Sequence, residues 1–253
     1  ESRTELAELE KLEKPTFWID RDSVENLDYR AAGRYEKFKT KNIRMNIRNE
    51  ESRSKHVLVS ARGLSLGYDA PLFDGIDIDL REGEAVELRG RNGAGKSTVI
   101  KALLGDTIAT RFAGELVLDP QVRVGVYEQE VSSDLFDMKL HDAIESIYLS
   151  QNLSVTETKI RQLMSDYLFL ESDGQVPVGR LSGGQKARLQ IIKMLSNDPQ
   201  LLILDEPTNH LDLPSIEELE AALEKYTGAI LYVSHDNYFR GKIGGEIVQI
   251  GKK

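Results

Sequence analysis

The sequence contains no cysteine, which excludes disulfide bonds, thiolate metal ligands and a cysteine nucleophile. Four histidines leave little scope for a zinc site. No segment approaches the ~20 consecutive apolar residues that a membrane-spanning helix needs. The acidic start of the chain, Glu1 to Glu5, is not followed by an apolar stretch, so we expect no signal peptide. These absences favour a cytoplasmic protein that inserts into no membrane.

What is present is an ordinary globular composition: 253 residues, 40% hydrophobic and 30% charged, enough for one large domain or two small ones. The net charge of −9 argues against nucleic acid as a partner. However, the segment Arg30 to Arg48 holds seven basic residues and one acidic residue. This segment is either a contact for phosphates or a solvated basic face.

The distribution of apolar, polar and charged residues divides the chain into three parts. Residues 1–14 place leucines at helical spacing among charges, and Pro15 ends the pattern, which predicts a short amphipathic helix. Residues 15–42 are polar and basic with scattered aromatic rings, as in a connector. Residues 43–253 form the folded domain. Because the first residue is not Met, we expect this sequence to be part of a longer protein.

Strands and helices alternate through the folded domain. Alternating apolar residues from Asn42 to Arg48 predict its first strand. A capping box at Ser154 to Glu157 predicts a helix running to about Leu170. Continuous apolar runs predict buried strands, so we expect an α/β fold whose parallel sheet is covered on both faces. The further expected strands are Val57–Leu66, Ile76–Leu80, Ala85–Arg89, Glu115–Leu118, Val122–Tyr127, Leu201–Leu204 and Ala229–Val233, and the further helices are His141–Ser150, one after Gly183–Gly184 reaching about Ser196, and Pro214–Tyr226.

Residues 90–97 read Gly-Arg-Asn-Gly-Ala-Gly-Lys-Ser and match the P-loop pattern, between an expected strand and an expected helix. Glycine amides and a helix N-terminus surround phosphate oxygens with donors. We expect Lys96 to reach the β and γ phosphates of ATP, Ser97 to bind Mg²⁺ and Thr98 to contact the α phosphate. Tyr68, at the end of a strand, is a candidate for stacking on the adenine. The candidate ATP-binding residues are therefore Tyr68, Gly90, Arg91, Asn92, Gly93, Ala94, Gly95, Lys96, Ser97 and Thr98.

Polar residues follow three other expected strands. Asp205 suits the outer coordination of Mg²⁺, and Glu206 is a candidate base that activates a water for attack on the γ phosphorus. Gln129 can offer its amide oxygen to Mg²⁺ or to that water, and His235 can donate to the γ phosphate. The alternatives are that the carboxylates cap the next helix and that the histidine is structural.

The segment Leu181-Ser-Gly-Gly-Gln185, together with the P-loop, Gln129, Asp205-Glu206 and His235 in that order, resembles the nucleotide-binding domain of the ATP-binding cassette (ABC) superfamily. The resemblance implies an ATP hydrolase with Mg²⁺. It also implies a mixed core sheet, an antiparallel β subdomain near residues 43–85 and a helical subdomain that precedes the signature, which is the segment Leu181 to Gln185. In this superfamily two cassettes sandwich two ATP molecules. The signature residues Leu181, Ser182, Gly183, Gly184 and Gln185 would then contact the ATP of the partner cassette.

Asn209-His210 before the D-loop residues Leu211 and Asp212 is similar to the ABC-F proteins. That resemblance implies a second cassette in the same polypeptide, joined by a helical hairpin of which residues 1–14 would be the end. It further implies action on the ribosome, as a translation factor or a protection protein that confers antibiotic resistance. Arg30 to Arg48 is then a candidate contact for ribosomal RNA. The partner cassette lies upstream or belongs to a second copy of the chain.

Two other readings share the ATPase chemistry. One is the ATPase subunit of a membrane transporter, which would dock on transmembrane partners. The other is a chromosome-maintenance ATPase, which would need long coiled coils between Ser97 and Leu181. That interval is too short for them, so the transporter subunit is the alternative that stays open.

Overall fold

The computed structural model describes residues 56–251 apart from 107, 129 and 210. The chain divides into two units, Glu1–Arg44 and Met45–Lys253, and all described residues belong to the second. The expected helix in residues 1–14, the connector 15–42, the strand from Asn42 and the segment Arg30 to Arg48 lie outside the described residues.

Parallel and antiparallel strands form separate sheets. The five-stranded sheet has the order β5-β6-β7-β3-β8, and all of its strand pairs are parallel. The three-stranded sheet has the order β2-β1-β4 and is antiparallel. The core sheet is therefore parallel rather than mixed, because the antiparallel strands pair among themselves. The strands are β1 (Val57–Gly67), β2 (Ile76–Arg81), β3 (Ala85–Arg89), β4 (Thr110–Leu118), β5 (Val124–Tyr127), β6 (Leu201–Asp205), β7 (Ala229–Val233) and β8 (Glu246–Gln249).

The antiparallel sheet extends beyond the expected residues 43–85, because β4 pairs along most of β1. One cluster of buried side chains joins this sheet to the parallel sheet and to helix α4 (Lys96–Leu103), with Leu64, Leu88 and Val99 among its members. Burying these apolar surfaces together fixes the start of α4 against both sheets.

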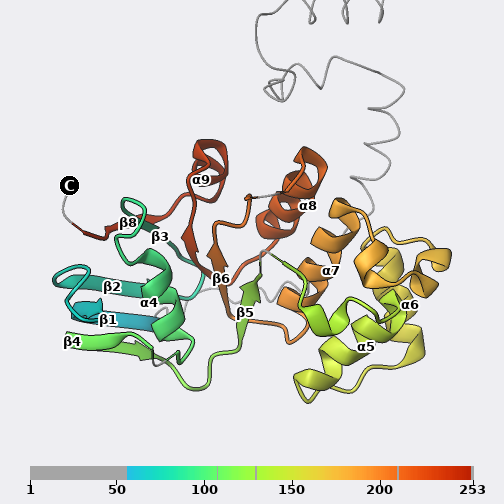
Figure 1. Cartoon of the computed structure of the whole chain (residues 1–253), viewed down its shortest axis with the longest axis horizontal. Helices are drawn as coiled ribbons and strands as arrows, with labels where there is room; N and C mark the ends of the chain where they lie inside the picture. The colour runs from blue at the N-terminus through green and yellow to red at the C-terminus, as the bar shows by residue number, and fades with distance from the viewer. Residues whose placement is uncertain (1–55, 107, 129, 210, 252–253) are drawn as a thin grey trace, which may run out of the picture. The chain divides into compact units, whose positions relative to one another are not determined.

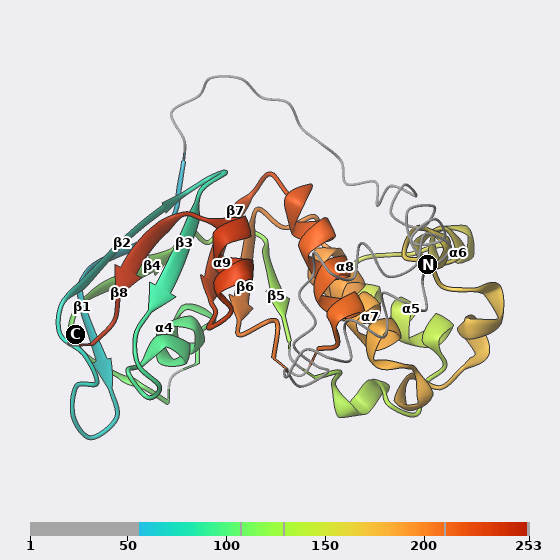
Figure 2. The same cartoon turned by 90° about the horizontal axis from the view of Figure 1, so that it is seen from above.

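The helical subdomain follows β5, as expected. It consists of α5 (Leu140–Ser150), α6 (Glu157–Asp166) and short 3₁₀ turns, and it leads into α7 (Gly183–Leu195). Figures 1 and 2 both show these helices on the opposite side of β5 and β6 from the antiparallel sheet. The capping box predicted at Ser154 is wrong: the side chain of Thr156 caps α6, and the helix ends at Asp166 rather than Leu170.

Two further helices follow strands of the parallel sheet: α8 (Leu213–Glu224) comes after β6, and α9 (Asn237–Ile243) comes after β7. Helix α8 starts one residue before the predicted Pro214–Tyr226, because Asp212 caps its N-terminus, and it ends two residues before the predicted end. Sequence patterning missed α9 and β8, since segments this short carry little periodicity. Among the described residues, no helix combines the length and apolar character needed to cross a membrane.

Candidate functional site

The P-loop joins β3 to α4, and its glycines are sterically required. Gly93 and Gly95 have φ angles of 78° and 103°, which side chains of L-residues rarely adopt. A Cβ atom on Gly95 would lie 2.8 Å from the ring of Phe73, and one on Gly90 would lie 2.4 Å from the carbonyl oxygen of Ile250. The loop therefore turns its backbone tightly at the N-terminus of α4, where amides can receive an anion.

Lys96 lies beneath this loop and is 8% exposed. Its Nζ donates to the carbonyl oxygens of Gly90 at 2.9 Å and Arg91 at 3.1 Å. Ser97 is exposed in the first turn of α4, whereas Thr98 is buried. An ammonium group held by two carbonyls, beside an accessible hydroxyl, can exchange these partners for phosphate oxygens. The remaining loop residues grade from exposed to half-buried: Arg91, Asn92, Gly93 and Ala94.

Asp205 ends β6 and Glu206 follows it, both half-buried. Glu206 holds a left-handed backbone with φ of 48°, and its N–H donates to the carbonyl of Val233 at 2.9 Å. Such a conformation in a residue other than glycine costs on the order of 1–3 kcal/mol and gathers at functional sites. The turn points the carboxylate of Glu206, which is 13% exposed, across to the end of β7.

His235 lies at that end, two residues after β7. Its backbone N–H donates to Oε2 of Glu206 at 3.0 Å, and its Nε2 lies 3.2 Å from Oε1. The same Nε2 lies 3.0 Å from Oδ1 of Asn92 in the P-loop. The structure therefore brings together Glu206, His235 and the P-loop. The link from Asn92 to His235 is new, since no spacing in the sequence connects two residues that far apart.

The signature segment caps α7. The hydroxyl of Ser182 accepts from the N–H of Gln185 at 3.2 Å, and the amide oxygen of Gln185 accepts from the N–H of Ser182 at 3.0 Å. A Cβ on Gly183 would come within 3.8 Å of Asp212, the N-cap of α8. Ser182 and Gly183 are exposed, Gly184 is half-buried and Leu181 is buried. The signature thus lies next to the segment Leu211–Asp212 and presents free amides at a helix start.

The P-loop and the signature do not meet within the chain. Both views place α4 and α7 on opposite sides of β5 and β6 (Figures 1 and 2). Tyr68 follows β1 and is 48% exposed, so its ring is accessible. Gln129 lies outside the described residues. The described residues hold no group of three or more His, Asp or Glu side chains that could bind a metal ion. A Mg²⁺ ion here would depend on Ser97, Asp205 and phosphate oxygens.

Helices α7 and α8 face each other through a charged pair. Arg188 Nη1 lies 3.3 Å from Oε1 of Glu218, and the Arg188 guanidinium lies over the ring of Phe169, 5.2 Å from its centroid. Burial raises the pKa of Glu218 to about 7; the charge of Arg188 opposes the rise, and the carboxylates of Asp212 and Glu217 add to it. The helices behind the signature and the D-loop are thus linked by a group that titrates near neutral pH.

Known proteins resemble this chain over the same residues. The family described as ABC transporter matches residues 73–209. The Bacillus subtilis protein YdiF is 37% identical over 78% of this chain and 30% of its own length. The ribosome protection protein VmlR of Bacillus subtilis is 34% identical over 68% of this chain and 30% of its own. ABC transporter F family member 5 of Arabidopsis thaliana is 32% identical over 79% of this chain and 29% of its own.

A solved structure of an ATP-binding subunit of an ABC transporter superposes with a TM-score of 0.63 at 24% identity, covering 77% of this chain and 86% of that one. This likeness supports the fold. The chain spans about a third of the length of the curated relatives it matches. The family match covers more than half of the sequence and includes the P-loop, the signature and the Asp205-Glu206 pair. The chain therefore belongs to the ABC transporter family and contains its ATP-binding domain.

Proposed function

We propose that this domain binds ATP with Mg²⁺ at the P-loop and hydrolyses it, with Glu206 as the base that activates water. The observation that carries the proposal is the cluster of Glu206, His235 and Asn92 at the mouth of the P-loop. Oε1 of Glu206 is buried and has no hydrogen-bond partner among the described residues, although Nε2 of His235 lies 3.2 Å away. A buried acceptor of this kind is suited to a water or hydroxyl that arrives with the substrate.

The other candidate residues would bind the phosphates, the metal ion and the adenine. Lys96 and the loop amides bind the β and γ phosphates, and Thr98 contacts the α phosphate. His235 donates to the γ phosphate while its backbone N–H holds Oε2 of Glu206, which leaves Oε1 for the water. Ser97, Asp205 and Gln129 would hold Mg²⁺, which supplies positive charge beside the transferred phosphoryl group. Tyr68 offers an accessible ring for the adenine, and the loop residues Gly90, Arg91, Asn92, Gly93, Ala94 and Gly95 would surround the phosphates.

We further propose that turnover requires a second cassette. The signature amides and Ser182 form an anion cradle at the start of α7, on the opposite side of β5 and β6 from helix α4 of the chain's own P-loop, so they would meet a γ phosphate held by the partner. Asp212, which follows Leu211 in the chain, lies beside this cradle. ATP held between two such faces would join the cassettes, and loss of the γ phosphate would separate them.

The proposed setting is the ribosome. Residues 43–253 would be the second cassette of an ABC-F protein, residues 1–14 the end of the linker between cassettes, and residues 15–42 a connector that carries part of the basic segment Arg30 to Arg48. Support comes from the likeness to a ribosome protection protein and to ABC transporter F family members. The alternative is the ATPase subunit of a membrane transporter, a class of protein that shares this fold.

The binding partner separates these two settings. Ribosomes from the source organism are sedimented with the protein carrying Glu206→Gln, with and without ATP, at near-physiological salt. We expect ATP-dependent pelleting, because slowed hydrolysis holds the closed state. The double variant Lys96→Ala with Glu206→Gln is the matched control and should stay in the supernatant with ATP. Absence of pelleting while ATP binding is intact would contradict the ribosome proposal and favour a membrane partner.

A further inference from the structure

A buried carboxylate lies behind the P-loop. Glu87 is on β3, the strand that runs into Gly90, and its side chain is 4% exposed. Arg89 lies on the same face of the strand, two residues on. Its Nε donates to Oε1 of Glu87 at 2.7 Å and its Nη2 to Oε2 at 2.6 Å. This two-pronged pair already satisfies the charge of Glu87.

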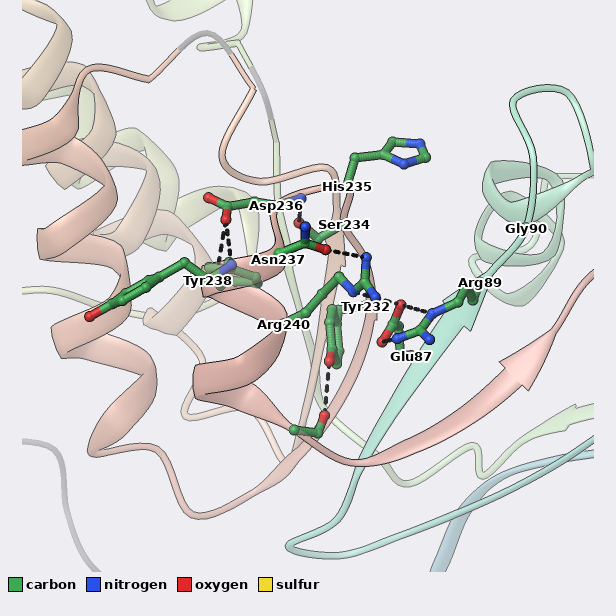
Figure 3. Close-up of polar contacts among 12 residues, drawn as sticks. Glu87, Arg89, Gly90, Tyr232, Ser234, His235, Asp236, Asn237, Tyr238 and Arg240 are labelled. Carbon is green, nitrogen blue, oxygen red and sulfur yellow. Dashed lines mark hydrogen bonds and ion pairs between the residues drawn. The ribbon is translucent and has the colours of Figure 1, made fainter. Parts of the chain in front are cut away.

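A second arginine nevertheless reaches the same carboxylate from α9 (Figure 3). Nε of Arg240 lies 3.2 Å from Oε1 of Glu87 as an ion pair without a hydrogen bond among the described residues, and its Nη1 donates to the side chain of Asn237 at 3.0 Å. Two cations on one carboxylate repel each other, so neutralising Glu87 does not require Arg240. What Arg240 adds is a link between β3 and α9.

Helix α9 is also fixed at its C-terminal end. The hydroxyl of Tyr232 donates to the carbonyl of Gly244 at 2.8 Å, and its ring meets Phe239 edge to face, with centroids 6.1 Å apart. Burial and the neighbouring Glu87 raise the pKa of Tyr232 to about 12, so this hydroxyl remains a donor. The helix is thus held at both Arg240 and Gly244.

The start of α9 determines where His235 lies. Asp236 follows His235 and caps the helix, accepting from the N–H groups of Tyr238 at 2.8 Å and Phe239 at 3.2 Å. A displacement of α9 therefore moves the backbone of His235. Since Nε2 of His235 contacts Asn92 in the P-loop, the contacts form a closed ring from β3 through the P-loop, His235 and α9 back to β3.

We infer that Arg240 is a positioning residue for His235: by binding Glu87 it fixes α9 against β3 and so sets the imidazole beside Glu206 and Asn92. This inference rests on the proposed function, because it takes the cluster around Glu206 to be the hydrolytic site. It assigns no contact between Arg240 and the nucleotide. Its consequences are the place of the His235 ring and, through it, the rate of turnover.

The first test reports position without needing activity. The whole chain is labelled with ¹³C-histidine, and the ring signals are recorded for the wild type and Arg240→Gln, with His235→Ala assigning the signal. We expect the His235 signal to shift in Arg240→Gln while those of His56 and His141 stay in place. Arg240→Lys, which keeps the charge at Glu87, should restore much of the original position. An unmoved His235 signal in folded Arg240→Gln overturns the inference.

Arg161→Gln is the matched control. Arg161 lies 3.0 Å from Glu157 in an exposed pair, and Glu157 also contacts His141. This variant should shift the signal of His141 and leave that of His235 unchanged. If Arg240→Gln does not fold, Glu87→Gln carries the same test, because the amide keeps the shape of the carboxylate and removes the charge that pairs with Arg240.

The second test is a double-mutant cycle on ATP turnover. We expect Arg240→Gln to lower kcat by about tenfold or more, since small displacements of catalytic groups are costly. In the His235→Ala background the same change should have no further effect. Equal losses in both backgrounds contradict positioning through His235. A shifted ring signal with unchanged kcat in both Arg240→Gln and His235→Ala would leave the inference standing and overturn the proposed catalytic role of His235.

Discussion

Glu206 has a left-handed backbone and contacts His235 through both of its carboxylate oxygens. A substitution that keeps the shape of this side chain and removes its charge therefore separates its role in catalysis from its role in folding. Glutamine at this position keeps an oxygen that accepts from the backbone N–H of His235 and removes the charge that a base needs. We expect Glu206→Gln to lower ATP turnover by about 100-fold or more. Its free energy of unfolding should stay within about 0.5 kcal/mol of the wild type. Phosphate release and thermal denaturation measure the two effects.

Glu115→Gln is a fair comparison, because Glu115 is exposed in β4. It should leave both quantities unchanged. Normal turnover in Glu206→Gln would reject Glu206 as the base.

Glycine substitutions test whether the P-loop requires glycine for steric reasons. Gly95 has a positive φ, and a Cβ there would press on Phe73. Gly95→Ala should therefore destabilise the domain by about 1–3 kcal/mol and weaken nucleotide binding. Gly241, inside α9, has open space around it, so Gly241→Ala should stabilise by about 0.5–1 kcal/mol. Denaturant unfolding and titration with a fluorescent nucleotide check both variants; equal effects would contradict the steric account.

At the scale of elements, the pair between α7 and α8 predicts a pH dependence. Burial raises the pKa of Glu218 from 4.5 to about 7, so the folded state binds the proton more tightly than the unfolded chain. Its contribution to stability is fully present below about pH 4.5 and is lost as the pH rises through about 7. Glutamine cannot titrate. Glu218→Gln should therefore gain stability relative to the wild type between pH 5 and pH 8.

Thermal unfolding of both proteins at pH 5, 6, 7 and 8 measures this difference in stability. The other titrating groups are the same in both proteins, so their contributions cancel. A difference in melting temperature that stays constant across the series would show that Glu218 does not titrate there. We expect the largest separation at pH 8, where the buried carboxylate of the wild type is ionised beside Asp212 and Glu217.

Elements whose determinants are adjacent in sequence could be predicted. The apolar runs of β6 and β7 and the helix that follows Ser182 depend on residues a few positions apart. The start of α6 failed because Ser154 and Thr156 both offer a hydroxyl cap, and only the packed structure selects Thr156. The separate antiparallel sheet needed the pairing of β1 with β4, which alternation alone does not give.

The site follows the same rule: residues within a short motif could be predicted, and contacts between distant residues could not. Lys96, Asp205 and Glu206 are recognisable because each lies in a short motif with its own chemistry. The contact of Asn92 with His235 and that of Glu87 with Arg240 join residues about 150 positions apart. No period or cap connects such residues, and only the order of strands β3 and β7 in the sheet brings them together.

For the whole molecule, the separation of the P-loop from the signature predicts that one chain contains two half-sites. Ser182→Asp tests this, because aspartate keeps the helix cap but places a negative charge where a partner's γ phosphate would bind. We expect stability and the chain's own nucleotide affinity to stay unchanged. Turnover should fall by about 100-fold or more, since a donor to the phosphate becomes a repelling charge.

Thr156→Asp makes the same chemical change at the cap of α6, in the helical subdomain, where no phosphate is proposed to bind. It should leave nucleotide affinity and turnover as they are. Fluorescent-nucleotide titration measures the half-site at the P-loop, and phosphate release measures the joined site. If Ser182→Asp weakened nucleotide binding as much as Lys96→Ala, the signature would serve the nucleotide of its own chain, and the two-cassette arrangement would be wrong. If instead affinity persists while turnover is lost, each ATP is bound by one cassette and its hydrolysis depends on the other.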